Sequence, residues 1–280
     1  MLSAILAAAV ITLAPGANPC ADPHLRLRCP DLVMSRPARL ATYREGRRVR
    51  LLQQNSIVNV GTGPLEVHGR RTGPRRMRAV QAIYSVRGLR RLFSTHGAEL
   101  EFKLIPGLGR FWKFHDAARM ELWTMDGGGH RVSLRRVGPK LTYCLRDLEH
   151  RRRSRRSPGR AVYPACNRGS HTRFDRLGTS VGWADVYPAT YFQNWVSVTG
   201  LRGCYALLQR ADPGHHLYES REDNNVSGRS VRLPLRPRRI RGGCPVYRGG
   251  RPSTAARHTA PRPHSRYSTP GIIGVRRANM

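Results

Sequence analysis

Short apolar runs separated by turn-forming residues dominate this sequence. Glycine, asparagine and proline stand between the runs, for example in GTGP at 61–64 and DGGG at 126–129, and such residues end strands rather than continue them. No segment keeps apolar residues at a helical spacing over four turns. The pattern therefore predicts a mostly β chain, folded as an antiparallel β-sandwich. The expected strands are 49–60, 64–68, 78–86, 100–105 and 120–125.

Two further apolar runs, 195–199 and 204–209, are joined by the short segment GLRG. Strand-like runs that are separated by a few residues including glycine are typical of a β-hairpin. We therefore expect these two strands to pair with each other.

Positive charge is the most unusual feature of the composition. Lys and Arg number 50 against 17 Asp and Glu, a formal net charge of +33, and only Lys103, Lys113 and Lys140 are lysines. Hydrophobic residues still make up 39% of the chain, which is enough for a folded core. A surface with this charge attracts polyanions such as nucleic acid, anionic lipid or acidic cell-wall polymers.

Two segments concentrate the arginines. Residues 151–160 read RRRSRRSPGR, and like charges at this density favour a solvated loop. Residues 236–280 combine Arg, Pro and Gly with no acidic residue, which predicts a disordered tail. Both segments are candidates for contact with anionic polymers. Specific nucleic-acid binding is not expected, because no aromatic residues interleave with the arginine block and no nucleic-acid fold motif is present.

The N-terminus and the cysteines indicate export. The apolar residues 2–14 followed by APGANP predict a signal peptide over residues 1–19, with a buried N-terminal helix or a misassigned start as the alternatives. No later apolar run reaches the length of a membrane span, which excludes a polytopic membrane protein. Six cysteines without a CxxC pair suit an oxidising compartment. We therefore expect a secreted or cell-envelope protein.

Five segments, taken in their order along the chain, are the most specific motifs in the sequence. The most specific is GTSVGWADVYPATYFQNWVSV at 178–198. The others are PDLV at 30–33, WKFHDAARMELW at 112–123, GPKLTYCLRD at 138–147 and ESREDNN at 219–225. The lysyl oxidase family has similar segments in the same order. The chain thus resembles a bacterial lysyl-oxidase-like protein with a degenerate copper motif, and the resemblance implies a lysyl-oxidase-like domain over residues 25–235.

The family builds a quinone cofactor, lysine tyrosylquinone, from a tyrosine and a lysine with the help of copper. The resemblance assigns these roles to Tyr187 in WADVYPA and Lys140 in GPKLTYCLRD. Only a phenol oxidises to an ortho-quinone, and only an uncharged primary amine adds to it. The quinone carbonyl then takes up a substrate amine as a Schiff base. The alternative is a surface lysine and a turn tyrosine beside Pro188.

The family's copper strand is altered here. Its H-x-H-x-H motif places three imidazoles on one strand face, and the matching residues are Phe111, Lys113 and His115. Phe111 offers no lone pair, and a protonated Lys113 repels a dication, so His115 is the one copper ligand left in the motif. The sequence predicts a degenerate copper site, and recruitment of other ligands is the alternative.

The resemblance also implies a calcium site. Calcium takes six to eight oxygen ligands with net negative charge. Arg221 stands where the family has an aspartate, which weakens the site, and Asp223 is a candidate to compensate. An Asn/Asp turn that closes a strand is the alternative. The matching residues are Asp31, Leu32 through its carbonyl, Glu219, Asn224 and Asn225.

Cys144 and Cys166 fall where the family has a disulfide, which would close a loop around the arginine block. Closing a loop of about 20 residues contributes roughly 3 kcal/mol in the chain-entropy model. We assign the remaining cysteines as Cys20–Cys29 and Cys204–Cys244, with free buried thiols as the alternative.

Two functions follow as expectations. The first is copper- and quinone-dependent oxidative deamination of primary amines, with peptidyl lysine as a candidate substrate, to aldehydes with release of peroxide. The second is a catalytically inactive family member that binds anionic polymers outside the cell. The matched Lys140 and Tyr187 favour the first, and the altered copper strand favours the second.

Overall fold

The computed structural model describes residues 10–11, 17–235 and 243–249 of the chain. Their regular structure is almost entirely β, and the strands form two sheets. Two single-turn 3₁₀ helices, η1 (Pro19–Ala21) and η2 (Pro23–Leu25), lie between strands β1 (Val10–Ile11) and β2 (Leu27–Arg28). In this part of the chain no helix is long and apolar enough to cross a membrane.

The larger sheet contains eleven strands. Their bounds are β1 Val10–Ile11, β2 Leu27–Arg28, β6 Leu65–Gly73, β7 Arg76–Ser85, β8 Arg90–Ile105, β9 Gly109–Met125, β10 Arg131–Val137, β11 Leu141–Tyr143, β13 Phe174–Thr179, β16 Gly203–Ala211 and β17 Val226–Leu233. The main path runs β13-β6-β7-β8-β9-β16-β17, and all of its pairs are antiparallel. Strand β1 lies parallel to β8.

The smaller sheet contains six strands. Their bounds are β3 Leu32–Met34, β4 Ala38–Glu45, β5 Arg48–Asn59, β12 Glu149–His150, β14 Trp183–Tyr187 and β15 Trp195–Ser197. Strand β5 is its centre, because β3, β4, β14 and β15 all pair with it antiparallel.

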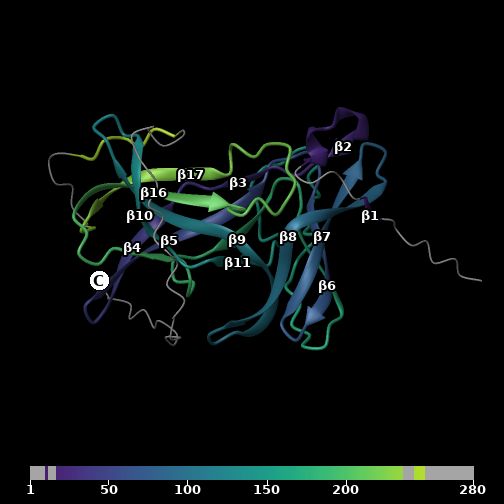
Figure 1. Cartoon of the computed structure of the whole chain (residues 1–280), viewed down its shortest axis with the longest axis horizontal. Coiled ribbons are helices and arrows are strands. Elements are labelled where there is room, and N and C mark those ends of the chain that lie inside the picture. The colour runs from purple at the N-terminus through teal and green to yellow at the C-terminus, as the bar shows by residue number, and fades with distance from the viewer. Residues whose placement is uncertain (1–9, 12–16, 236–242, 250–280) are drawn as a thin grey trace, which may run out of the picture.

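Strand β9 connects the two ends of the molecule (Figure 1). Its first half pairs with β8 at 109–114, and its second half pairs with β16 at 118–124. Between them Asp116 has a left-handed backbone, with φ of 52°, a conformation that Asp tolerates better than most residues. The strand therefore changes partners beside the segment that resembles the copper motif.

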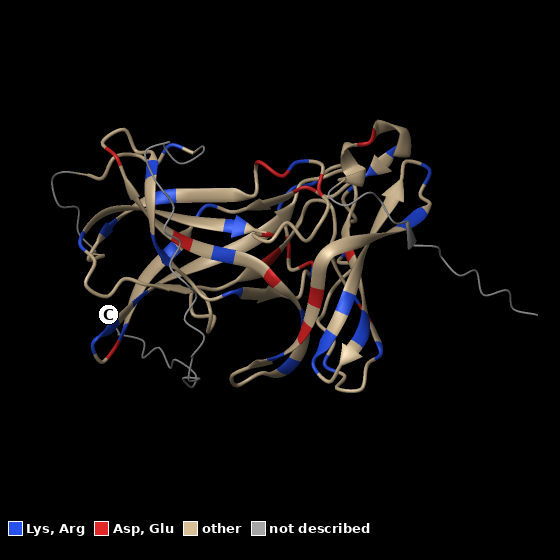
Figure 2. Cartoon of the chain, in the orientation of Figure 1, with Lys and Arg blue, Asp and Glu red and all other residues tan. Residues whose placement is uncertain are grey.

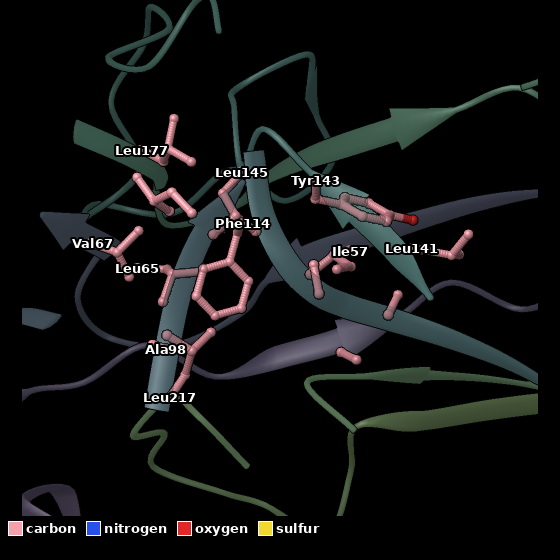
Figure 3. Close-up of a cluster of buried hydrophobic side chains, with 14 of the residues drawn as sticks. Ile57, Leu65, Val67, Ala98, Phe114, Leu141, Tyr143, Leu145, Leu177 and Leu217 are labelled. Atoms are coloured by element: carbon pink, nitrogen blue, oxygen red, sulfur yellow. The ribbon is translucent and has the colours of Figure 1, made fainter. Parts of the chain in front are cut away.

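The main hydrophobic core lies between the two sheets. Figure 3 shows Phe114 of β9 among side chains of the larger sheet, with Ile57 of β5 close by. Phe114, Leu65 and Ile57 have no exposed surface. Full burial of one such side chain contributes about 1.5–3 kcal/mol to the stability of the fold. Because these residues come from both sheets, their burial holds the two sheets together.

The predicted fold class is confirmed at the level of a mostly β chain with antiparallel sheets. The five expected strands are present as β5 to β9, and β8 and β9 begin earlier than predicted. The predicted hairpin is wrong: β15 pairs with β5, whereas β16 pairs with β9 and β17. Val196 and Leu207 share one core cluster, so the two strands meet through buried side chains from different sheets.

Three disulfides join the predicted cysteine pairs, Cys20–Cys29, Cys144–Cys166 and Cys204–Cys244. Disulfides persist in oxidising compartments, and they fit a secreted or extracellular protein.

The two predicted terminal segments fall largely outside the described residues. Of the predicted leader, 1–9 and 12–16 lie outside them, and β1 pairs with Leu92 and Phe93. Of the predicted tail, 236–242 and 250–280 lie outside them, but residues 243–249 are part of the fold. Cys244 is bonded to Cys204, and the Arg248 amide donates to the Gly129 carbonyl at 3.0 Å. The tail predicted from residue 236 thus contains a segment that a disulfide holds on the larger sheet.

Candidate functional site

Tyr187 lies at the end of β14 in the core between the sheets. Its side chain is buried, and its ring packs edge-on against Tyr143 and Tyr191 at centroid distances of 4.5 and 4.6 Å. The Tyr187 hydroxyl accepts hydrogen bonds from Lys113 Nζ at 2.8 Å and from the Cys144 amide at 3.2 Å. The tyrosine matched to the quinone precursor is therefore held on all sides by protein groups.

Lys113 projects from β9 into this tyrosine cluster. Its Nζ also donates to the Tyr191 hydroxyl at 3.0 Å and lies 4.5 Å from the centre of the Tyr187 ring. Burial lowers the pKa of Lys113 to about 7, although the Asp185 carboxylate opposes this shift. The amine is thus held by two phenol hydroxyls and two ring faces.

Asp185 is the acidic member of the cluster. It lies on β14 two residues before Tyr187, and its side chain is fully buried. Burial raises its pKa to about 6, against the influence of Lys113 and Arg146. Burial also raises the pKa of the Tyr187 phenol well above its ordinary value, and Asp185 adds to this shift. Tyr187 is therefore protonated at neutral pH.

Lys140 does not join this cluster. Its Nζ lies 3.2 Å from Asp116 Oδ2, and its side chain is more than half exposed, whereas Asp116 is buried. Asp116 also accepts from Arg119 at 3.1 Å. The structure thus pairs the predicted cofactor lysine with a carboxylate beside the bend of β9, and it places Lys113 instead against Tyr187.

The residues of the copper motif do not fit the family's three-imidazole site. Phe111 packs under the Arg168 guanidinium, which lies 5.0 Å from the ring centre. His115 Nδ1 lies 3.2 Å from Glu101 Oε2. Lys113, the middle residue of the motif, already donates to the hydroxyls of Tyr187 and Tyr191. One imidazole with a carboxylate neighbour remains, so we derive no chemical step through copper.

The residues of the predicted calcium site do come together, although about 190 positions separate the two segments. The Asn224 amide donates to Asp31 Oδ1 at 2.7 Å, and the Asn225 amide donates to Glu219 Oε1 at 2.8 Å. The Leu32 amide donates to Glu219 Oε2. We call these five residues the Asp31–Glu219 cluster.

The Asp31–Glu219 cluster fits a hard cation. The side-chain oxygens of Asn224 and Asn225 are buried without a hydrogen-bond partner, and amide oxygens are ligands that calcium uses. Burial raises the pKa of the Glu219 carboxyl well above its usual range, and a nearby cation would favour its charged form. Asp31, Glu219, Asn224 and Asn225 would hold calcium through their oxygens, with Leu32 supplying its carbonyl.

Arg221 does not enter the Asp31–Glu219 cluster. Its guanidinium lies 3.4 Å from Asp223 Oδ1, and both side chains are exposed. Asp223 therefore neutralises Arg221 and does not replace the missing ligand. The cluster contains two carboxylates, those of Asp31 and Glu219. In the described residues no group of three or more His, Cys, Asp or Glu is arranged to hold a metal.

Sequence reasoning missed several members of both sites. Asp185 could have been found, because residues two apart on a strand share a face and Asp185 precedes Tyr187 by two. Asp116, Glu101 and Tyr191 carry no such signal, since their contacts depend on the partner change of β9 and on the turn after β14.

Comparison of the chain with protein-family models gives no match, and comparison with curated proteins gives none either. The assignment to the lysyl oxidase family therefore rests on the five sequence segments alone.

Proposed function

We propose that this protein is a non-catalytic, lysyl-oxidase-like β domain that binds anionic polymers outside the cell. The observation that carries the proposal is the excess of positive charge on a folded, disulfide-linked chain, 50 Lys and Arg against 17 Asp and Glu. Arginines and lysines occur on both sheets and at both ends of the molecule (Figure 2). Such a surface raises the local concentration of polyanions and speeds their association.

The tyrosine cluster supports the non-catalytic half of the proposal. Quinone formation by the family's route needs an amine from Lys140 and oxidation of Tyr187. Lys140 is held by Asp116, and the Tyr187 phenol is protonated and hydrogen-bonded to Lys113. These contacts stabilise the unmodified side chains. Copper- and quinone-dependent amine oxidation is the competing proposal. Of the three positions in its copper motif, only His115 offers an imidazole.

The test uses the full-length protein in two assays. We expect retention on immobilised dextran sulfate at physiological salt, and no peroxide release from a primary amine such as butylamine after incubation with Cu(II) in air. Lys140→Ala is the matched variant for the second assay. Peroxide release that disappears in Lys140→Ala would overturn the proposal in favour of amine oxidation. Failure to bind the polyanion would overturn the binding function itself.

A further inference from the structure

The arginine block at 151–160 is the exposed loop that its sequence predicts, but its backbone is anchored to the fold. The amides of Arg151 and Arg152 both donate to the Gly182 carbonyl at 2.9 Å. Ser157 Oγ donates to the Arg152 carbonyl at 3.0 Å, and the Trp183 indole donates to the Pro158 carbonyl at 3.0 Å. The backbone of the block is thus fixed on the start of β14, while its arginine side chains are exposed.

Gly182 is what allows the block to dock this closely. Its φ is +79°, and a Cβ there would collide with the Arg152 carbonyl and the Ser157 hydroxyl. The Gly182 amide donates to the Asn59 carbonyl at 2.7 Å. Backbone-to-backbone contact on both sides of this glycine holds the arginine-bearing turn against β5 and β14.

Five of the six arginines in the block have no acidic partner. Arg151 pairs with Glu149 at 2.6 Å. Among the described residues no carboxylate lies within 4.0 Å of the other five guanidinium groups, those of Arg152, Arg153, Arg155, Arg156 and Arg160. The first four of these lie together on the turn 152–156. Like charges held together on a fixed turn repel one another, and an anion placed between them would relieve that repulsion.

These arginines line a hollow of about 670 Å³. One side is the turn 152–156, and the other side is formed by the segments 60–62 and 181–182. None of the lining residues is acidic, and Thr62 and Ser154 add hydroxyl groups. The hollow therefore presents hydrogen-bond donors and positive charge without a competing carboxylate.

We propose that this arginine hollow is the binding site for the phosphate groups of a phosphate-bearing polymer, an inference that rests on the proposed function and names its ligand. Guanidinium groups bind phosphate through two parallel hydrogen bonds, whereas other cations act as point charges. The turn 152–156 carries four guanidinium groups, about twice the charge of one phosphate dianion, which favours successive phosphates of a linear chain over one small anion.

The experiment titrates the full-length protein with long-chain inorganic polyphosphate at physiological salt. The loop variant replaces Arg152, Arg153, Arg155 and Arg156 by serine. The control variant makes the same change at Arg44, Arg47, Arg48 and Arg87, which are exposed and form no ion pair with an acidic side chain of the described structure. Both variants remove the same net charge, and circular dichroism confirms that each is folded.

We expect the loop variant to bind polyphosphate at least tenfold more weakly, because it loses four direct contacts with phosphate. The control variant should bind less than threefold more weakly, because it loses only long-range attraction that salt screens. The salt dependence should also flatten in the loop variant, by about one unit of slope for each phosphate that the variant no longer neutralises. Ser157→Ala, which keeps every charge but frees the Arg152 carbonyl, should weaken binding by a smaller factor.

Equal weakening in the loop and control variants would overturn the arginine hollow as the site and leave the proposed function standing. Equal affinity of the wild type for polyphosphate and for polyglutamate of matched charge would overturn the phosphate preference. Absence of polyphosphate and dextran sulfate binding in the wild type would overturn both the inference and the proposed function.

Discussion

The tyrosine cluster around Lys113 and the Asp31–Glu219 cluster are both buried polar groups inside one β fold, but they differ in what they leave unsatisfied. In the first, the Lys113 amine donates to two phenols, and Tyr187 accepts from Lys113 and Cys144. In the second, two buried amide oxygens accept no hydrogen bond, and a buried carboxyl has a strongly raised pKa. The tyrosine cluster leaves one buried oxygen without a hydrogen bond, Asp185 Oδ1, and the Arg146 guanidinium lies 3.9 Å from that oxygen. The Asp31–Glu219 cluster instead leaves two amide oxygens beside two carboxylates, an oxygen-rich set that gains from a bound cation.

The largest expected effect is the pH dependence that Lys113 gives to folding. Its pKa is about 7 in the fold and about 10.4 in the unfolded chain. Between these values the unfolded state binds more protons, so the Lys113 contribution to stability increases as pH rises from about 7 to 10. Asp185 acts in the opposite direction, since its pKa is raised to about 6, and its contribution falls with rising pH between about 4 and 6.

The variant Lys113→Met isolates this contribution. The difference in unfolding free energy between wild type and Lys113→Met should change by about 2–3 kcal/mol in favour of the wild type between pH 7.5 and pH 9.5. Urea unfolding at the two pH values measures it, with Lys103→Met as the control. Parallel pH profiles for wild type and Lys113→Met would contradict the buried-amine account.

Calcium should act on the other cluster. At a free Ca²⁺ concentration 100 times the Kd, binding to the native state alone stabilises by about 2.7 kcal/mol. For a domain of this size each kcal/mol corresponds to about 2–4 °C in Tm. Differential scanning fluorimetry should therefore show a rise of roughly 5–10 °C with Ca²⁺ and much less with Mg²⁺, which demands a smaller octahedral site.

Glu219→Gln should abolish the calcium response while Glu99→Gln keeps it, because Glu99 forms an exposed pair with Arg76. The calcium response of the wild type should weaken as pH falls, since the raised pKa of Glu219 means that its proton competes with the cation. A calcium shift that survives in Glu219→Gln would place the cation elsewhere.

The smallest effect is expected at Lys140. Its contact with Asp116 is a partly exposed ion pair, and such pairs contribute about 0–1 kcal/mol. Lys140→Ala should therefore unfold within about 1 kcal/mol of the wild type. A larger drop in stability, or a change in absorbance on exposure to Cu(II) and air in the wild type alone, would show that Lys140 does more than pair with Asp116.

The sequence predicted the strands from local patterns and the Cys144–Cys166 pair from an ordered motif, whereas the other two cysteine pairs were assigned from the cysteines that remained. It also predicted that Asp31 and Glu219 lie together. It did not predict that β15 and β16 lie in different sheets, because a short glycine-containing segment resembles a hairpin turn whichever partners the strands choose. Nor did it predict the contact of Lys113 with Tyr187, which depends on the change of partners along β9 at Asp116. The exposed loop of the arginine block was predicted, but its anchoring on Gly182 was not, because that contact joins segments about 30 residues apart.

The central claim is that Lys113 and Tyr187 form a finished, unmodified pair rather than an immature quinone site. Peptide mass mapping after incubation of the purified protein with Cu(II) in air tests it most directly. The account predicts that the peptides containing Lys140 and Tyr187 keep their unmodified masses while the protein remains folded. A cross-linked peptide joining Lys140 to an oxidised Tyr187 would contradict the claim and make amine oxidation the function.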